Sequence, residues 1–350
     1  MSVEEPVTRP RTKKKRTGRI VLLSVLSLVV IAALVAGGYV WNLGRTFNDN
    51  SQKLENAFPA EESRPEVKKE SEDALNILLL GSDTRAERDE ELDGGSEEFG
   101  TLPNGGRSDT MMLVHIPTDR SAVYVTSIMR DTWLDLPGIG EAKINRAFAN
   151  GGVPKAVETL EGLFGVRIDH VASVDFEGFK GLTDAVGGIT INNPRAFRQS
   201  IVNGMYFPEG RQTLDGEQAL AFVRERKSFP GSDYQRVKNQ QLYVKALLGQ
   251  ILSKDTLTNP LKIQNIVSEF SPFIAVDDTL DATKVVDIAS SMRNIGTSDM
   301  EFFTLPNKGP GRSADGQSIV IPDMDTINKF GEALQNDTVD EFVASTDLSQ

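Results

Sequence analysis

A long uncharged run, Ile20–Trp41, constrains this chain more than any other feature. As a helix its 22 residues would extend about 33 Å, enough to cross the hydrocarbon core of a bilayer. Seven basic residues precede it, and positive charge stays on the cytoplasmic side, so we expect residues 1–19 inside and residues 42–350 outside. The alternative is a cleaved signal peptide, whose apolar run is usually only about 7–15 residues long. We therefore expect one transmembrane helix at residues 20–41 and an extracytoplasmic domain.

The remainder of the chain is acidic and lacks cysteine. Residues 42–350 carry 31 basic and 48 acidic side chains, a balance of −17, so we expect no nucleic-acid partner. The cysteine count of zero excludes disulfides, thiol nucleophiles and cysteine-ligated zinc. Because there are only two histidines, a bound metal would need oxygen ligands, which favours Mg²⁺, Ca²⁺ or Mn²⁺.

Apolar patterning predicts the fold class. Short apolar runs predict buried strands at 76–81, 111–116 and 122–128. Helical spacing predicts helices at 154–164, 176–186, 218–226, 233–252 and 282–295, with another strand near 301–305. This alternation indicates an α/β fold, an α-β-α layered domain with a central mixed sheet. We expect this domain over 74–335, after a polar stalk at 42–73 and before an acidic, flexible tail at 336–350.

Charged residues gather at the ends of the first three predicted strands. Asp83 and Arg85 follow the first strand, Arg107 and Asp109 precede the second, and Arg130 and Asp131 follow the third. These segments share one edge of the sheet only if the second strand is antiparallel. Aspartates in such turns are by default turn or capping residues. Their arginine neighbours favour a phosphate–metal site, where carboxylates hold a hard cation and guanidinium groups bind phosphate oxygens.

A second cluster lies within residues 224–245, where six basic and two acidic residues reverse the sign of the domain's charge. Arg236 and Gln240 are four residues apart on one face of the predicted helix, and Asp233 can cap its start. A solvated helix face would also explain these charges. The local reversal of sign favours an anion site.

The order of the short motifs along the chain is itself informative. They are Asn76–Arg85, Arg107–Met112, Ser127–Asp131, Lys143–Phe148, Val174–Phe176, Gly187–Ile189, the Arg224-x-Arg226 pair, and Asp233, Arg236 and Gln240–Gln241. Each motif alone is weak. In this joint order they resemble the LytR-CpsA-Psr family, closely over residues 74–250 and more loosely over the rest of the domain.

The resemblance implies an extracytoplasmic ligase, held in the cell membrane by its single amino-terminal helix. Such enzymes take a glycopolymer from a polyprenyl-pyrophosphate carrier and attach it to peptidoglycan, usually at the 6-hydroxyl of N-acetylmuramic acid, through a phosphodiester. The resemblance also implies Mg²⁺ at the pyrophosphate, with Mn²⁺ as a substitute. Residues 74–335 would then be the catalytic domain.

Roles carry over position by position. Asp83 and Asp109 match the metal-associated aspartates. The pyrophosphate-binding positions are matched by Arg85, Arg107, Arg130, Arg224, Arg226 and Arg236, and a head-group contact by Gln240. We predict that Asp83, Asp109, Arg130 and Asp131 are catalytic, with Asp83 or Asp131 as the base that activates the acceptor hydroxyl. Many relatives have a second arginine where this chain has Asn239, a lost charge that Lys238 would replace.

The family also has an apolar groove for the carrier between sheet and helices. Candidates for lipid contact are Phe148, Leu160, Leu163, Phe164, Val171, Phe176 and Phe179. For any one of them, an ordinary core position is the simpler explanation.

Three alternatives stay open from the sequence. The same site could hydrolyse the polyprenyl pyrophosphate, with water as the acceptor. The protein could instead be a non-enzymatic envelope regulator or scaffold, although a 19-residue cytoplasmic segment is too short for a DNA-binding domain. The acceptor could also be a protein rather than peptidoglycan. Nothing in the sequence names the polymer.

Overall fold

The computed structural model describes residues 38–82, 108–200, 204–229 and 232–348. Within these ranges no helix combines the length and the apolar character needed to cross a bilayer. Most of the predicted membrane segment, residues 20–37, lies outside the described residues, as does the acidic stretch 86–106.

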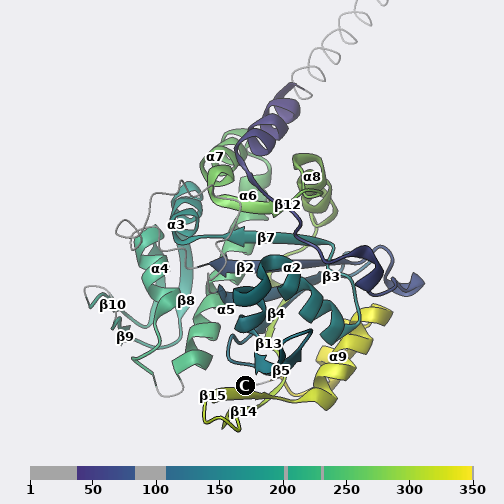
Figure 1. The fold of residues 1–350 in the computed structure, drawn as a ribbon. Helices are drawn as coiled ribbons and strands as arrows, with labels where there is room; N and C mark the ends of the chain where they lie inside the picture. Colours follow the sequence, from purple (N-terminus) through teal and green to yellow (C-terminus); the bar gives the residue numbers. More distant parts are fainter. Residues whose placement is uncertain (1–37, 83–107, 201–203, 230–231, 349–350) are drawn as a thin grey trace, which may run out of the picture.

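A seven-stranded sheet forms the centre of the domain (Figure 1). Its order is β1 (Gln52–Leu54), β12 (Ile274–Asp277), β7 (His170–Val174), β2 (Leu75–Ser82), β3 (Ser108–Ile116), β4 (Val123–Ile128) and β13 (Met300–Thr304). β2 is parallel to β7 and antiparallel to β3, and β4 is antiparallel to β3 and parallel to β13. The predicted α/β fold with a central mixed sheet is thereby confirmed.

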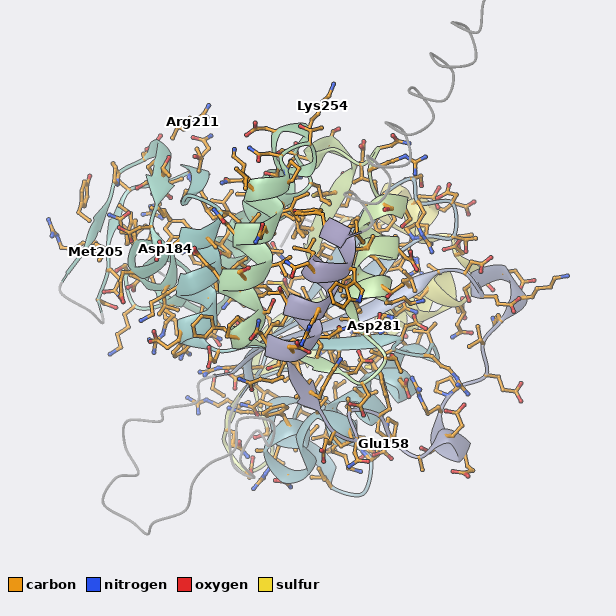
Figure 2. The ribbon with its side chains drawn as sticks, turned by 90° about the horizontal axis from the view of Figure 1, so that it is seen from above. Glu158, Asp184, Met205, Arg211, Lys254 and Asp281 are labelled. Atoms are coloured by element: carbon orange, nitrogen blue, oxygen red, sulfur yellow. The ribbon has the colours of Figure 1, made fainter. Side chains whose placement is uncertain are left out.

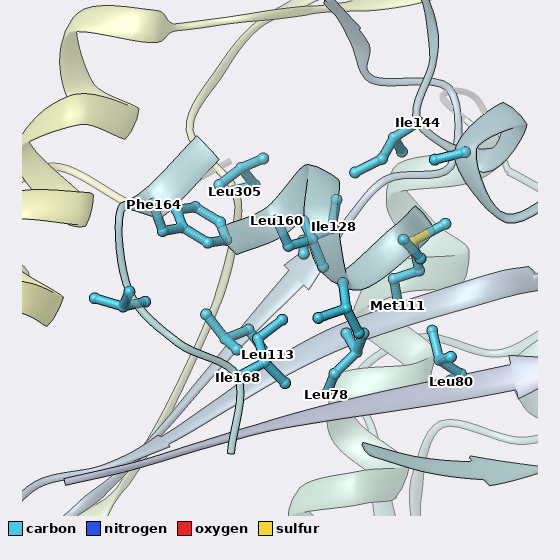
Figure 3. Close-up of a cluster of buried hydrophobic side chains, with 14 of the residues drawn as sticks. Leu78, Leu80, Met111, Leu113, Ile128, Ile144, Leu160, Phe164, Ile168 and Leu305 are labelled. Carbon is cyan, nitrogen blue, oxygen red and sulfur yellow. The ribbon is translucent and has the colours of Figure 1, made fainter. Parts of the chain in front are cut away.

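Alternate residues of the central strands face opposite layers. Leu78 and Leu80 join a core with α2 (Asn145–Phe164), α9 (Met324–Asn336) and α10 (Val339–Ser345), part of which Figure 3 shows. Ile77 and Leu79 face the other side, toward α5 (Ser232–Ile251) and α8 (Ala282–Ser291). Because both faces are covered, these strands read as continuous apolar runs rather than alternating ones.

A smaller unit with its own core lies beside the main sheet. It contains α3 (Phe176–Ala185), α4 (Gly216–Arg224), the β8–β11 pair (Ile189–Asn193 and Gly210–Leu214) and the β9–β10 pair (Phe197–Arg198 and Tyr206–Phe207). Further elements are a helix over residues 38–50, hairpins β5–β6 (Trp133–Leu136, Gly140–Lys143) and β14–β15 (Asn307–Arg312, Ser318–Pro322), and helices α6 (Lys254–Leu257) and α7 (Pro260–Phe270).

Both segments predicted to lie outside the folded domain pack against it. Phe47 and Leu54 are buried, and β1 extends the sheet by pairing with β12, so residues 42–73 are not a free stalk. At the other end, α10 buries Val339 and Phe342 in the main core, so the predicted flexible tail begins too early. Isolated apolar residues among many charges give too weak a pattern to reveal such docking.

Candidate functional site

The antiparallel arrangement of β2, β3 and β4 brings three charged segments to one edge of the sheet. Gly81 pairs with Thr110 and Ser82 with Ser108, and Met111 pairs with Ile128 at the end of β4. The predicted residues Asp83, Arg85 and Arg107 lie outside the described residues, and of Asp109 only the backbone, within β3, is described.

Asp233 is the centre of the described site. Its Oδ1 lies 2.6 Å from Arg226 Nη2, and its Oδ2 lies 3.6 Å from Arg236 Nη2 and 3.7 Å from Arg130 Nε. Arg130 follows β4, Arg226 follows α4, and Arg236 lies on α5. Three separate elements therefore bring guanidinium groups to one carboxylate, which cannot neutralise them all.

A second ion pair adjoins this carboxylate. Asp131 Oδ1 lies 3.1 Å from Lys143 Nζ, and Asp131 Oδ2 lies 3.7 Å from Arg130 Nε. We call these six residues the arginine cluster: Arg130, Asp131, Lys143, Arg226, Asp233 and Arg236. Four cations and two carboxylates give it a formal charge of +2. Its side chains range from 6% exposed at Arg236 to 34% exposed at Arg226, so its fields are less screened than those of surface pairs.

Backbone hydrogen bonds hold the Arg130–Asp131 turn in place. Val320 N donates to Asp131 O at 2.8 Å, which ties the turn to β15, and Asn145 N donates to Arg130 O at 3.3 Å. Val320 also packs with Met129 and Val237, the latter on the first turns of α5. The same contacts therefore fix the turn of Arg130 relative to the helix of Asp233 and Arg236.

A buried carboxylate orders the turn that carries Arg226. Glu225 is fully buried and accepts hydrogen bonds from Ser200 N at 2.6 Å and Ser228 N at 2.8 Å. Burial alone would raise the pKa of Glu225, but these hydrogen bonds outweigh it and lower the pKa below its ordinary value. Glu225 is thus held ionised where it fixes the residues on either side of it.

The remaining predicted polar residues lie around the cluster. Gln240 Nε2 donates to Thr110 Oγ1 at 2.9 Å, so this residue of α5 reaches the start of β3. Arg224 does not join the ion pairs around Asp233, and its guanidinium lies 4.3 Å from the ring centroid of Phe176. Asn239 is buried and donates to Phe222 O, whereas Lys238 is exposed. Position 239 therefore faces the core of the smaller unit, and Lys238 does not replace a charge there.

The candidate lipid-binding residues do not form one cluster. Phe148, Leu160, Phe164 and Val171 are buried in the main core, with Leu163 at its margin. Phe179 instead packs in the core of the smaller unit, its ring 4.4 Å from that of Tyr243, while Phe176 lies under Arg224.

Two members of the arginine cluster were not among the predicted site residues. Lys143 stood in a quoted motif without a role, and Asp233 was expected to cap a helix. Asp233 instead lies inside the first turn of α5 and forms ion pairs. The spacing of Asp233 three residues before Arg236 was the one available signal, since their side chains meet on one helix face.

No group of three or more metal-ligating side chains occurs within the described ranges. The described carboxylates of the cluster are engaged by cations. The two predicted metal-associated aspartates, Asp83 and Asp109, follow Ser82 and Ser108 directly in the sequence. Ser82 and Ser108 pair across β2 and β3.

A cleft of about 810 Å³ lies at the other end of the sheet, beside the first residues of β2 and β7. Acidic side chains dominate its lining: Glu72, Asp73, Asp169, Asp281 and Asp287 face only Arg120 and Lys284. We call it the acidic cleft. Its charge repels phosphate, so its size does not make it the site of phosphate chemistry.

Known proteins match most of this chain. The model of the LytR_cpsA_psr family matches residues 40–336. The polyisoprenyl-teichoic acid–peptidoglycan teichoic acid transferase TagU of Oceanobacillus iheyensis is 32% identical over 343 aligned residues, covering 93% of this chain and 96% of TagU. The cell wall biosynthesis protein LcpA of Corynebacterium glutamicum is 31% identical over 291 residues, covering 73% of this chain but only 55% of LcpA.

Solved structures share the fold. The crystal structure of B. subtilis TagV aligns with a TM-score of 0.63 at 25% identity, covering 76% of this chain and 98% of TagV. The structure of TagT bound to LI-WTA aligns with a TM-score of 0.60 at 22% identity, covering 82% of this chain and 99% of TagT. At that identity the likeness to TagT concerns the fold alone.

Proposed function

The chain belongs to the LytR_cpsA_psr family, and we propose that it transfers a glycopolymer from a polyprenyl-pyrophosphate carrier to peptidoglycan. The bond formed is a phosphodiester to the 6-hydroxyl of muramic acid. The transferase activity for which TagU is named supports this reaction class, because TagU matches this chain over nearly its full length. We place the reaction at the outer face of the cell membrane, with residues 20–41 as a single-pass anchor.

The arginine cluster is the observation that carries the proposal. A pyrophosphate diester bears about two negative charges, and the cluster bears a formal charge of +2 at a sheet edge of an otherwise acidic domain. Asp233 acts as the counter-ion that holds the guanidinium groups together before donor binds. The phosphate oxygens of the donor then bind the same guanidinium groups alongside Asp233. This step needs little movement of the arginine side chains.

The chemistry is a substitution at phosphorus. The acceptor hydroxyl oxygen attacks the phosphorus that bears the glycopolymer, and the bond from that phosphorus to the bridging oxygen breaks. Polyprenyl phosphate leaves with the electron pair of that bond. Arg130, Arg226 and Arg236 stabilise the negative charge that develops on the leaving group and on the transferring phosphoryl oxygens.

The proton of the acceptor hydroxyl must pass to a base. Both oxygens of Asp131 are already engaged, one by Lys143 and one by Arg130, so protonation there would disrupt an ion pair. This arrangement favours Asp83 over Asp131 as the base. The test is Asp83→Ala, which should abolish transfer; intact transfer would remove Asp83 from the role.

We further propose that Asp83 and Asp109 hold Mg²⁺, which Mn²⁺ can replace. Carboxylate oxygens are the ligands these cations prefer, and the pairing of Ser82 with Ser108 supports the proximity of the next residues. When bound, the metal neutralises part of the pyrophosphate charge and orients its oxygens. Titration calorimetry with Mg²⁺ on the wild type and on Asp109→Asn tests this assignment without an activity assay.

The carrier chain would lie between the sheet and α2. Phe148, Leu160 and Val171 fill that space in this structure, so α2 must shift to admit a lipid. The helix is broken at Gly151–Gly152, where the backbone leaves helical angles, and this break supports such a shift.

The assay supplies the full-length protein in nanodiscs with lipid-linked donor, with and without peptidoglycan oligomers. A ligase yields polymer-linked muropeptide, detected by mass spectrometry, only when the oligomers are present. Release of free polymer at the same rate without acceptor would identify a hydrolase instead. Polymer appearing on a protein would change the acceptor and leave the donor chemistry intact.

The non-enzymatic alternative is tested in cells. The double variant Arg130→Ala/Arg236→Ala removes two of the three guanidinium groups, whereas Arg211→Ala removes an exposed arginine that projects outward from β11 (Figure 2). We expect loss of wall polymer only in the double variant. Full function of the double variant would favour a scaffold.

A further inference from the structure

An exposed apolar patch lies where the described chain begins. Val40 is 50% exposed, Trp41 is 66% exposed, and Leu261, at the start of α7, is 71% exposed. Tyr39 OH donates a hydrogen bond to Pro260 O at 2.5 Å, which joins the two parts of the patch. Figure 1 shows α7 beside the helix of residues 38–50. The patch is therefore held by a specific contact between segments 221 residues apart.

The helix of residues 38–50 is fixed to the domain along its length. Asn48 Oδ1 accepts a hydrogen bond from Ala282 N at 3.0 Å, and Phe47 is buried with Leu280 and Ala282. At 1.5 Å per residue, Tyr39 lies about 13 Å further along this helix than Asn48. Leu261 therefore lies close to Tyr39, Val40 and Trp41, the last residues of the predicted membrane segment.

We propose that Leu261, with Val40 and Trp41, inserts into the outer leaflet of the membrane and sets the orientation of the domain. The inference rests on the proposed anchor at residues 20–41. It adds a second contact, from α7, that lies more than 200 residues away in the sequence.

The position and size of the patch favour a lipid surface over a protein partner. The polar residue Asn42 ends the predicted membrane segment at Trp41, inside the patch, so an inserted segment would bring the bilayer surface to these side chains. Trp41 also suits the interface, because its ring is 5.8 Å from the Arg45 guanidinium and combines an apolar body with a polar neighbour. Three side chains cannot supply the roughly 800 Å² per partner of a stable protein interface, whereas shallow insertion of a few apolar groups is typical of membrane-surface contacts.

Single-cysteine spin labelling tests this contact directly, because the chain has no native cysteine. The full-length protein is labelled at Leu261→Cys and reconstituted in nanodiscs of phosphatidylcholine and phosphatidylglycerol. Collision with oxygen, which concentrates in lipid, is compared with collision with a water-soluble nickel chelate. The matched controls are Met324→Cys on α9, 39% exposed, and Val30→Cys within the uncharged run.

We expect the Leu261 and Val30 labels to collide preferentially with oxygen and the Met324 label with nickel. A Leu261 label that behaves like Met324, beside an inserted Val30 label, would overturn this inference and leave the anchor and the proposed function intact. A label at Leu261 shielded from both reagents would indicate a protein or second-copy contact and would also overturn it. An aqueous Val30 label would overturn the anchor itself.

Discussion

The two ends of the central sheet differ in charge and in shape. At the end where β2 and β4 finish, Asp233 is shared by three guanidinium groups. At the opposite end the chain forms a cleft of about 810 Å³ whose lining is mostly acidic. The acidic cleft is thus unsuitable for a pyrophosphate, because its negative charge repels an anion.

The two ends also use their carboxylates differently. Asp277, behind the acidic cleft, is fully buried and accepts hydrogen bonds from Val171 N at 2.9 Å and Leu280 N at 3.1 Å, and it contacts His170 Nδ1 at 3.2 Å. Asp233 instead forms ion pairs with the arginine side chains of Arg130, Arg226 and Arg236. One carboxylate is held mainly by hydrogen bonds in the core, and the other is shared by three guanidinium groups.

The largest expected effect is on transfer. Arg130→Ala or Arg226→Ala should each lower the transfer rate about 100-fold, because each removes a cation that faces the developing negative charge. Product formation from lipid-linked donor measures this, and thermal melting verifies folding. Arg211→Ala is the control and should transfer at the wild-type rate. Equal transfer rates for all three variants would show that the arginine cluster does not take part in the reaction.

The next effect is on stability at the acidic-cleft end. Burial alone would raise the pKa of Asp277, but hydrogen bonds from His170, Thr279 and Val171 outweigh burial and lower the pKa to about 2. Since the unfolded carboxyl titrates near pH 4, ionised Asp277 contributes about 2 kcal/mol of stability at neutral pH. Asp277→Asn should lower the unfolding free energy by about that amount without changing the transfer rate.

The contribution of Asp277 to the unfolding free energy also depends on pH. The stabilisation from Asp277 is present above about pH 4 and is lost as the pH falls toward 2, because the unfolded state then takes up a proton first. Denaturant unfolding at several pH values measures this loss. The loss should be smaller in Asp277→Asn than in the wild type. Identical acid profiles would show that Asp277 is not held ionised by its neighbours.

A smaller effect is expected on anion affinity. Asp233→Asn removes the internal carboxylate that competes for the guanidinium groups, so inorganic pyrophosphate should bind about tenfold more tightly. Titration calorimetry measures the dissociation constant, with Asp135→Asn, an exposed residue of β5, as the control. Weaker binding in Asp233→Asn would mean that Asp233 positions the arginines more than it competes with the ligand.

The smallest effect on transfer is expected from substitutions in the acidic cleft. The double variant Glu72→Gln/Asp287→Asn reduces the acidity of the cleft at two exposed positions. Transfer should stay within about twofold of the wild type, as for surface substitutions in general. A large loss of transfer would place part of the substrate in the acidic cleft.

Sequence reasoning found the elements that carry continuous signals. β2, β3 and β4 each contain a mainly apolar run, and α3, α4 and α5 begin and end within two residues of the predicted bounds. β1 and α10 were not predicted because each depends on a few apolar residues whose partners, such as Asp277 for Leu54, lie far away in the sequence. Short strands of this kind are defined by tertiary pairing rather than by local pattern.

The site was partly accessible in the same way. Residue type and spacing singled out Arg130, Arg226 and Arg236, which the structure brings together around Asp233. The role of Lys143 could not be predicted, since it is the last residue of β6 and meets Asp131 only through the fold of the β5–β6 hairpin. The roles of Asp83, Asp109, Arg85 and Arg107 stay predictions.

The docking of residues 42–57 onto the sheet has a consequence for reach. A flexible linker of the 32 residues 42–73 would have a mean end-to-end distance of about 30 Å, which would let a domain move that far from its point of attachment. Here β1 pairs with β12 in the sheet and Leu54 is buried, so residues 42–57 do not act as a flexible linker. If residues 20–37 are embedded, the working height above the bilayer is set in advance. The domain would then reach only the layer of the cell wall nearest the membrane.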